Sequence, residues 1–113
     1  MTDKIYGFLG LAAKAGKVVS GEETCERAIK SGKAKIVIVA EDASQNTKKK
    51  FGDACSYRSL EIRYFGQKEL IGRYTGKEIR SVVAILDQGF AGRLKEMIDG
   101  KGYENGGVRI VES

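Results

Sequence analysis

Residues 36–40 read I-V-I-V-A, a run of β-branched residues that no polar residue interrupts. A strand with one solvent-exposed face alternates apolar and polar residues, whereas a strand covered on both faces is apolar throughout. A second apolar run, S-V-V-A-I-L, occupies residues 81–86, and the alternating stretch L-E-I-R-Y-F at 60–65 predicts a less buried strand. The chain therefore predicts a small sheet whose strands at 36–40 and 81–86 are covered on both sides.

Segments with helical spacing of apolar residues separate these strands. The expected helices cover residues 3–14, 20–31, 46–57, 67–74 and 87–98, and a short extended piece at 17–19 joins the first two. Ser20 and Glu23 form a capping-box pattern at the start of the second helix, and Gly32 ends that helix. Helices that alternate with short buried strands imply the α/β class, as a sandwich with helices on both sides of a small sheet.

The chain has 113 residues, which suits one domain at residues 1–100 followed by a glycine-rich tail at 101–113. Within the tail, residues 108–111 could add a weak edge strand. No apolar run approaches the roughly 18 residues that a membrane helix needs, and the first residues lack the pattern of a secretory signal. We therefore expect a cytoplasmic protein that does not enter a membrane.

Histidine is absent, and the two cysteines, Cys25 and Cys55, are too few for a disulfide scaffold and form no CxxC motif. Without histidine the chain lacks the commonest metal ligand and the usual general base at neutral pH. Catalytic triads, cysteine–histidine pairs and zinc sites that contain histidine are therefore excluded. Both cysteines are expected to be buried thiols.

Two acids, Asp42 and Asp87, follow directly after the apolar strands, at the end of the sheet where α/β proteins bind ligands. A phospho-receiver or small enzyme would use them, but the chain opens with a helix rather than with the strand-borne acid pair that such a pocket requires. The stronger interpretation is that each acid caps the next helix. The stretch G-L-A-A-K-A-G-K at 10–17 differs from a P-loop in spacing, and Val18 replaces the hydroxyl residue that holds magnesium.

The stretch S-G-E-E-T-C-E-R at 20–27 contains three glutamates, Glu22, Glu23 and Glu26, in a chain of net charge +5. Acids in the first turn of a helix are favoured by its dipole, by roughly 0.3–1 kcal/mol each. Glu23 stands four residues before Arg27, a favourable spacing for an ion pair, and Glu26 has Lys30 at the same spacing. Adjacent side chains on a helix point about 100° apart, so these acids predict helix stabilisation and not a catalytic carboxylate pair.

The basic residues gather in three places along the sequence, around the second expected helix, at the start of the third, and beside the loop that precedes the last apolar strand. They are Lys14, Lys17, Arg27, Lys30, Lys33 and Lys35; Lys48, Lys49 and Lys50; and Arg73, Lys77 and Arg80. Loops at one end of a sheet can lie together, so these residues could form one positive surface that meets phosphates. The plainer alternative is a set of dispersed lysines that keep the protein soluble.

Three segments in order, G-E-E-T-C-E-R-A-I-K-S-G, K-I-V-I-V-A-E-D-A-S and E-L-I-G-R-Y-T-G-K-E-I-R-S-V-V-A-I, resemble the kink-turn RNA-binding ribosomal protein family, the L-seven-Ae and L-thirty-e superfamily. The stretches V-V-S-G-E-E, A-E-D-A-S-Q-N-T and L-D-Q-G-F-A resemble its bacterial YlxQ-type branch, and the similarity spans about residues 3–99. The resemblance implies a three-layer α/β/α sandwich with a small mixed four-stranded sheet, no cofactor and no catalysis.

In that family, the helix after the glycine reads RNA through an Asn-Glu pair and a Lys three residues later, and the pair meets the sheared G·A pairs of a kink-turn. Aligned on the glycines that flank the helix, the Asn position is Glu23, the Glu position is Thr24 and the Lys position is Arg27. Only Arg27 keeps the family's chemistry, because a carboxylate accepts hydrogen bonds and cannot donate one as Asn does. The family's second reading element, an apolar loop before the last strand, falls at residues 77–80.

The resemblance therefore implies a set of residues at the RNA. Gly21, Glu22, Glu23, Thr24, Arg27 and Lys30 would face it, Lys33, Lys48 and Lys77 would contact phosphates, and Ile79 and Arg80 would form the second contact. We expect a non-catalytic, monomeric RNA-binding protein of ribosomal-protein type, with kink-turn-like or ribosomal RNA, the ribosome or translation factors as partners. The alternative is a protein-interaction module of the translation or transcription machinery that keeps the fold and presents the glutamates to a protein.

Overall fold

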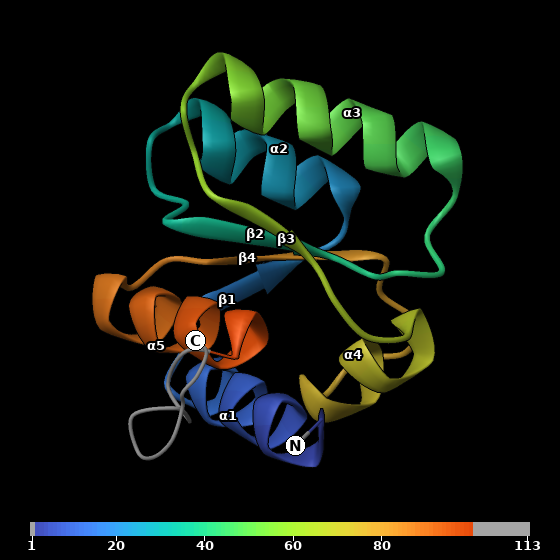
Figure 1. Cartoon of the computed structure of the whole chain (residues 1–113), viewed down its shortest axis with the longest axis vertical. Helices are drawn as coiled ribbons and strands as arrows, with labels where there is room; N and C mark the ends of the chain where they lie inside the picture. The colour runs from blue at the N-terminus through green and yellow to red at the C-terminus, as the bar shows by residue number, and fades with distance from the viewer. Residues whose placement is uncertain (1, 101–113) are drawn as a thin grey trace.

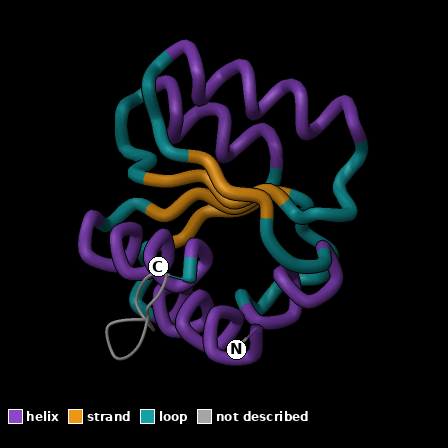
Figure 2. Tube along the Cα trace, in the orientation of Figure 1, coloured by secondary structure: helices purple, strands orange, loops and turns teal. Residues whose placement is uncertain are grey.

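The computed structural model describes residues 2–100; Met1 and residues 101–113, with the tail and the weak strand expected at 108–111, lie outside the described residues. The described chain folds into three layers, with a sheet in the middle and helices on both sides (Figure 1). Figure 2 shows the strands stacked edge-on between the two helix layers. The expected α/β/α sandwich is confirmed.

The elements follow the predicted order, and their bounds differ from the expected ones by a few residues. They are α1 (Thr2–Lys14), β1 (Val18–Ser20), α2 (Glu22–Lys30), β2 (Ile36–Val39), α3 (Gln45–Tyr57), β3 (Ile62–Tyr64), α4 (Lys68–Tyr74), β4 (Val82–Ile85) and α5 (Gln88–Asp99). The strand order is β1-β4-β2-β3, with β2 and β3 parallel and β4 antiparallel to both of its neighbours. The sheet of the described chain is therefore the mixed four-stranded sheet that was expected.

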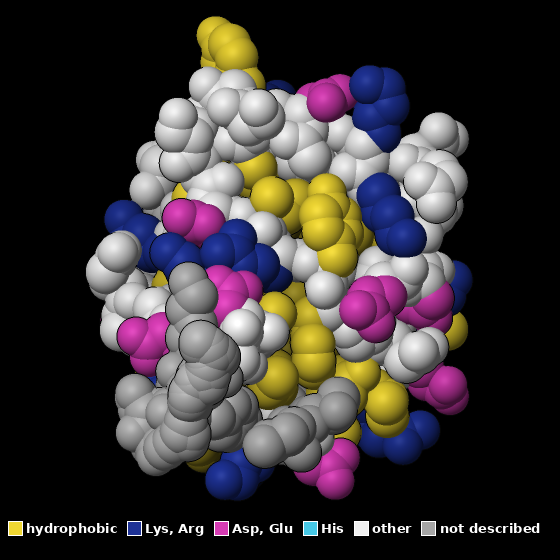
Figure 3. Space-filling model, viewed as in Figure 1, with side chains coloured by type: hydrophobic (Ala, Val, Ile, Leu, Met, Phe, Trp, Pro, Cys, Tyr) yellow, Lys and Arg dark blue, Asp and Glu magenta, His cyan; other side chains and the backbone are white. Residues whose placement is uncertain are grey.

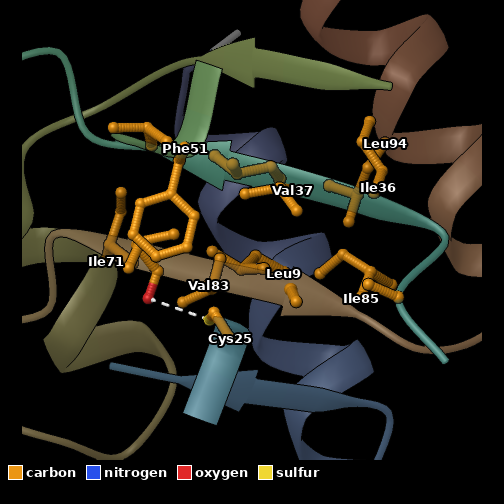
Figure 4. Close-up of a cluster of buried hydrophobic side chains, with 14 of the residues drawn as sticks. Leu9, Cys25, Ile36, Val37, Phe51, Ile71, Val83, Ile85 and Leu94 are labelled. Carbon is orange, nitrogen blue, oxygen red and sulfur yellow. Dashed lines mark hydrogen bonds between the residues drawn. The ribbon is translucent and has the colours of Figure 1, made fainter. Parts of the chain in front are cut away.

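The central strands β2 and β4 are the two apolar runs, and all of their residues are buried. Helices α2 and α3 cover one face of the sheet, and α1, α4 and α5 cover the other (Figure 1). In the core (Figure 4), Phe51 of α3 and Leu9 of α1 approach the sheet from opposite sides, and both are buried. This cover is what strands without a polar face require.

Both cysteines are buried free thiols, as expected. The Cys25 thiol donates to the carbonyl oxygens of Val19 and Val82 over distances of 3.6 and 3.7 Å, and the second contact is drawn in Figure 4. Burial raises the pKa of Cys25 to about 12 and that of Cys55 to about 11. Both thiols therefore stay protonated at neutral pH, which makes them poor nucleophiles.

Side-chain oxygens hold the first turns of α3, α4 and α5. Ser44 caps α3 and Asp87 caps α5, each accepting a backbone N–H of the first turn at 3.1 and 2.9 Å. Asp42 accepts from the backbone N–H of Lys68 at 2.8 Å, which places it at the start of α4. The expectation for Asp87 is confirmed, but the expectation that Asp42 caps the helix that follows it is wrong, because Ser44 occupies that position.

The start of α2 also differs from its expected form. Ser20 is the last residue of β1, and the N-cap is Gly21, at φ 94°, with no side chain capping the helix. The Ser20 hydroxyl instead accepts a hydrogen bond from Arg80 Nε at 3.0 Å. The predicted capping box is therefore wrong, because pairing of Ser20 with β4 moves the helix start to Gly21, whose positive φ favours glycine.

The loop between α4 and β4, residues 75–81, folds back onto α4. Lys77 N donates to the carbonyl of Gly72 at 2.8 Å, and Arg80 N donates to the carbonyl of Lys68 at 3.0 Å. Gly72 leaves no room for a side chain, because an added Cβ would lie 1.2 Å from the carbonyl oxygen of Glu78. Glycine at this position lets the loop rest directly on the helix.

We predict that Gly72→Ala destabilises the protein, because the loop backbone must move to remove the clash. The free energy of unfolding should fall by about 1–3 kcal/mol, as measured by urea denaturation. The matched control is Gly92→Ala on the exposed side of α5, where an added Cβ would meet no atom within 4 Å. The control should be neutral or stabilising, and a Gly72→Ala protein as stable as the wild type would contradict the described loop.

Candidate nucleic-acid interface

Two segments that are far apart in the sequence meet at the start of α2: the β1–α2 junction and the loop that precedes β4. Arg80 Nε donates to Ser20 Oγ at 3.0 Å, and Gly21 N donates to the carbonyl of Val82 at 3.1 Å. They meet because β1 and β4 are antiparallel neighbours, so the end of β1 lies beside the start of β4. The fold therefore brings together the two elements that were expected to contact RNA.

One side of α2 borders a shallow hollow of about 600 Å³. Its apolar lining includes Val19, Ala28 and Leu86. Its polar lining includes four of the expected RNA-facing residues, Thr24, Arg27, Lys30 and Lys33, and the three cations among them are exposed. A hollow with a cationic rim suits a ligand that carries phosphates.

Two of the three glutamates of α2 turn toward α3 instead. Lys50 Nζ lies 3.1 Å from Glu22 Oε1 and 3.2 Å from Glu26 Oε2. Thr47 Oγ1 donates to Glu22 Oε2 at 2.7 Å. The bond from Thr47, and then that from Lys50, lowers the pKa of Glu22, while the bonds to Glu22 and Glu26 raise the pKa of Lys50. Glu26 therefore pairs with Lys50 across two helices, in place of the expected Lys30.

Glu23 is the glutamate that points outward. Its side chain is 87% exposed, and Arg27 Nη1 lies 3.2 Å from its Oε2, which confirms the expected i,i+4 pair. The Arg27 side chain is itself 66% exposed. An exposed pair of this kind contributes little to stability, so it can open when a ligand offers either partner a better contact.

The second element presents an apolar tip. Ile79 is 58% exposed, and it lies between Lys77 and Arg80, whose backbone N–H groups donate to carbonyls of α4. The Arg80 guanidinium donates to Ser20 Oγ and to the Ile79 carbonyl, so its position is fixed beside α2. Lys77 is exposed two residues before Ile79. The loop thus offers one apolar side chain, two basic ones and the exposed acid Glu78 next to the start of α2.

Lys48 is the expected phosphate contact that the structure places apart from the others. It lines a separate hollow, about 460 Å³ in volume, together with Tyr64 of β3. The hollow beside α2 is lined by neither of these residues. Lys48 was grouped with the other lysines on the expectation that loops at one end of the sheet lie together, whereas Lys50, two residues later, is the lysine that bonds α2.

The cations beside the β3 edge are already paired. Arg63 bonds Asp99 at 2.8 Å and Glu61 at 3.0 Å, and Lys95 bonds Glu61 at 3.3 Å. On the face shown in Figure 3, basic and acidic side chains are interspersed around exposed apolar ones. A surface of paired charges attracts phosphates less than the cationic rim beside α2 does.

Sequence reasoning missed that Thr47 and Lys50 position the acids of α2. Thr47 is the buried polar residue of the described chain, and its hydroxyl accepts from Ser44, three residues earlier. The ion pair of Lys50 with Glu22 joins residues 28 positions apart, a separation at which periodicity carries no information.

Two kinds of feature are absent from the described residues. Residues 2–100 contain no group of three or more histidine, cysteine, aspartate or glutamate residues that could hold a metal ion. Within the same range, no helix combines the length and apolar character that crossing a membrane would need.

Known proteins resemble this chain in sequence and in fold. Residues 3–95 match the family model described as the ribosomal protein L7Ae/L30e/S12e/Gadd45 family. The RNA-binding protein YlxQ of Bacillus subtilis is 45% identical over 94 residues, which cover 83% of this chain and 94% of that protein. The RNA-binding protein YlxQ of Enterococcus faecium is 44% identical over 97 residues, which cover 86% and 93%. The solved structure of a Bacillus halodurans protein of unknown function superposes with a TM-score of 0.82 at 36% identity, over 85% of this chain and 97% of that chain.

We predict that Glu22→Gln lowers the free energy of unfolding at neutral pH and has little effect in acid. The bonds from Thr47 and Lys50 place the folded-state pKa of Glu22 below its ordinary value of 4.5. The ionised Glu22 side chain therefore adds to the free energy of unfolding above its unfolded-state pKa. This contribution is lost as the pH falls through its folded-state pKa. Urea denaturation of both proteins at about pH 7 and about pH 3 measures the difference.

The same change at the neighbouring, more exposed acid, Glu23→Gln, is the control and should alter stability less at neutral pH. A Glu22→Gln protein that loses the same stability at both pH values would show that the contacts to Thr47 and Lys50 do not act through the charge of Glu22.

Proposed function

The chain belongs to the ribosomal protein L7Ae/L30e/S12e/Gadd45 family, and we propose that it is a non-catalytic RNA-binding protein whose α2 surface reads a kink-turn-like element of structured RNA. The relatives named RNA-binding protein YlxQ support RNA as the ligand, since they match most of this chain at 44–45% identity. The family's description as ribosomal proteins favours ribosomal RNA, met in the cytoplasm, as the source of that element.

One observation supports this proposal above the others. The hydrogen bond from Arg80 to Ser20 joins the start of α2 to the loop that carries Ile79. Base-reading groups on α2 and an apolar tip that can pack on an unstacked base then share one surface. RNA bends and bulges expose both base edges and base faces, so a surface that offers both kinds of contact suits such a site.

The exposed groups divide into phosphate contacts and base contacts. Arg27, Lys30 and Lys33 around the hollow, with Lys77 on the loop, would bind phosphates and fix the orientation of the RNA. Glu23 would accept from the N1–H and N2–H groups of a guanine, which are donors that a carboxylate can read. When Glu23 turns to the base, Arg27 is released to a phosphate.

The contact between α2 and α3 reduces the electrostatic repulsion that opposes this binding. Carboxylates beside a phosphate backbone are repelled, and α2 carries three of them. Lys50 offsets part of the charge of Glu22 and Glu26 by bonding both, at 3.1 and 3.2 Å. Glu23 is left as the acid that faces outward. The alternative of an acidic face for a protein partner loses its main support, because two of its three acids are bound to α3.

We predict tight binding to a kink-turn RNA and binding at least roughly 10-fold weaker when its G·A pairs are replaced by Watson–Crick pairs. Affinity should also fall steeply between about 0.05 and 0.2 M salt, because bound phosphates release counterions. Fluorescence anisotropy with labelled RNA measures both effects. Arg27→Gln should weaken binding and reduce the salt slope, whereas Lys95→Gln, a cation already paired beside β3, should do neither.

Equal affinity for the two RNAs would contradict kink-turn reading by α2. A salt-independent affinity would contradict the assignment of Arg27, Lys30 and Lys33 to phosphates.

We predict that Glu23→Asn tightens binding to the kink-turn RNA by roughly 5-fold or more. The amide restores a donor at the position where the family has Asn, removes a negative charge near phosphates, and frees Arg27 from its ion pair. The control is Asp53→Asn, which makes the same acid-to-amide change in the exposed i,i+4 pair with Lys49 on α3. Tightening in both variants would indicate a general charge effect, weaker binding in Glu23→Asn would contradict the predicted gain from the amide, and an unchanged affinity would contradict the placement of position 23 at the RNA.

A further inference from the structure

A second hollow lies on the other side of the molecule's sheet, between α1 and α4, which run next to each other there (Figure 1). It has a volume of about 420 Å³, and residues 7, 10 and 14 of α1 face residues 70, 73 and 74 of α4 across it. An adjoining hollow of about 270 Å³ shares Gly10, Lys14 and Tyr74 and reaches Gly76. The two together form a groove, called the α1–α4 groove below, that leads toward the Ile79 loop.

Two glycines of α1 line the α1–α4 groove, together with the apolar residues Leu11 and Leu70. Gly7, Gly10 and Lys14 lie on one face of α1, at helical spacing. An added Cβ at Gly10 would lie 3.0 Å from the carbonyl oxygen of Tyr74, so the close approach of α1 and α4 accounts for that glycine. At Gly7 it would meet nothing within 4 Å, although glycine weakens a helix interior. Packing therefore does not account for Gly7, whereas a groove that must stay open does.

The wall of the groove is an aromatic ring that the fold holds in place. The ring of Tyr74 stacks on that of Tyr6, with centroids 5.2 Å apart and an interplanar angle of 20°. Tyr6 is itself fixed, because its hydroxyl accepts from the backbone N–H of Gln67 at 2.9 Å and its ring contacts Phe65. Tyr74 is nevertheless 41% exposed. A ring that is fixed on one side and open on the other is a platform for a flat ligand.

The charge of the groove is positive. Lys14 and Arg73 flank it and are exposed, and the residues that line it include no carboxylate. Arg73 forms an ion pair with Glu69, in which Nη2 and Oε2 lie 3.8 Å apart. Both side chains are at least two-thirds exposed, so this pair is weak. An aromatic platform between two cations is complementary to a planar base joined to phosphate.

We propose that the α1–α4 groove binds one unpaired nucleotide of the RNA strand that leaves the α2 surface, with its base on Tyr74 and its phosphates at Lys14 and Arg73. This inference rests on the proposed function. The loop that presents Ile79 begins at the end of the groove, at Thr75 and Gly76, so a strand crossing the loop reaches the groove without leaving the protein surface. The volume is within the range of sites that hold molecules of nucleotide size.

The test compares two RNAs that share one kink-turn. One ends flush, and the other carries a single-stranded extension of about four nucleotides, a length typical of short single-strand sites. The extension should tighten binding by roughly 10-fold, the gain expected for one stacked base. Tyr74→Leu should remove this gain and leave the affinity for the flush RNA unchanged, whereas Tyr74→Phe, which keeps the ring, should retain it. A 5-iodouridine placed in the extension should crosslink within residues 68–76.

Two further variants separate binding from folding. Gly7→Leu should fill the groove and remove the gain from the extension, yet raise the thermal midpoint, because leucine is a better helix former than glycine. Lys14→Gln should lower the salt dependence of the gain, and Lys4→Gln, at the exposed start of the same helix, should not.

An extension that adds nothing, or a gain that survives Tyr74→Leu and Gly7→Leu, would overturn the groove proposal while kink-turn binding stands. Failure to bind either RNA would overturn the proposed function and this inference with it. If the extension adds nothing and sedimentation shows self-association that Tyr74→Leu abolishes, the groove is an interface between copies of the chain, and the nucleotide proposal is wrong.

Discussion

Two central strands without a polar face set the constraint on which this structure depends. Because β2 and β4 are apolar on both sides, each face of the sheet must be covered by helices. The short strand β1 completes one flank by pairing antiparallel with β4, which places its last residue beside the first residues of β4. The start of α2 and the loop before β4 become neighbours for that reason. The candidate interface is a product of the sheet topology before any side chain contributes to it.

Charge on α2 is organised by contacts between helices. A basic protein that presents three glutamates on its proposed RNA-binding helix would repel phosphates if all three faced outward. Contacts across the α2–α3 interface draw two of them onto Lys50 and Thr47. The acids then serve the packing of two helices, and the outer side of α2 keeps its cations. The net charge of the chain says little about this surface, because the sign that a ligand meets depends on which side chains are already paired.

The class of fold and the order of its elements could be predicted from the sequence, because apolar periodicity is a local property that both strands and helices must satisfy. The errors arose where a residue has two competing partners. Ser20 had the pattern of a helix cap, but it pairs with β4 as the last residue of β1. Asp42 precedes α3 in the sequence, but Ser44 is nearer to the first residue of that helix and caps it, while Asp42 bonds the start of α4. The residues assigned to RNA remain a prediction, and the α1–α4 groove had no local signal, since Gly7 and Tyr74 meet only in the folded chain.

The two edge strands of the sheet are short. β1 and β3 have three residues each, and β3 is the outermost strand on its side, with one neighbour. Exposed strand edges can add a strand from another molecule, which is a route to aggregation. At β3 the central residue is Arg63, whose guanidinium is bound to Asp99 of α5 and to Glu61. An incoming strand would have to desolvate this charge cluster over a very short edge, which disfavours pairing of sheets between molecules at β3.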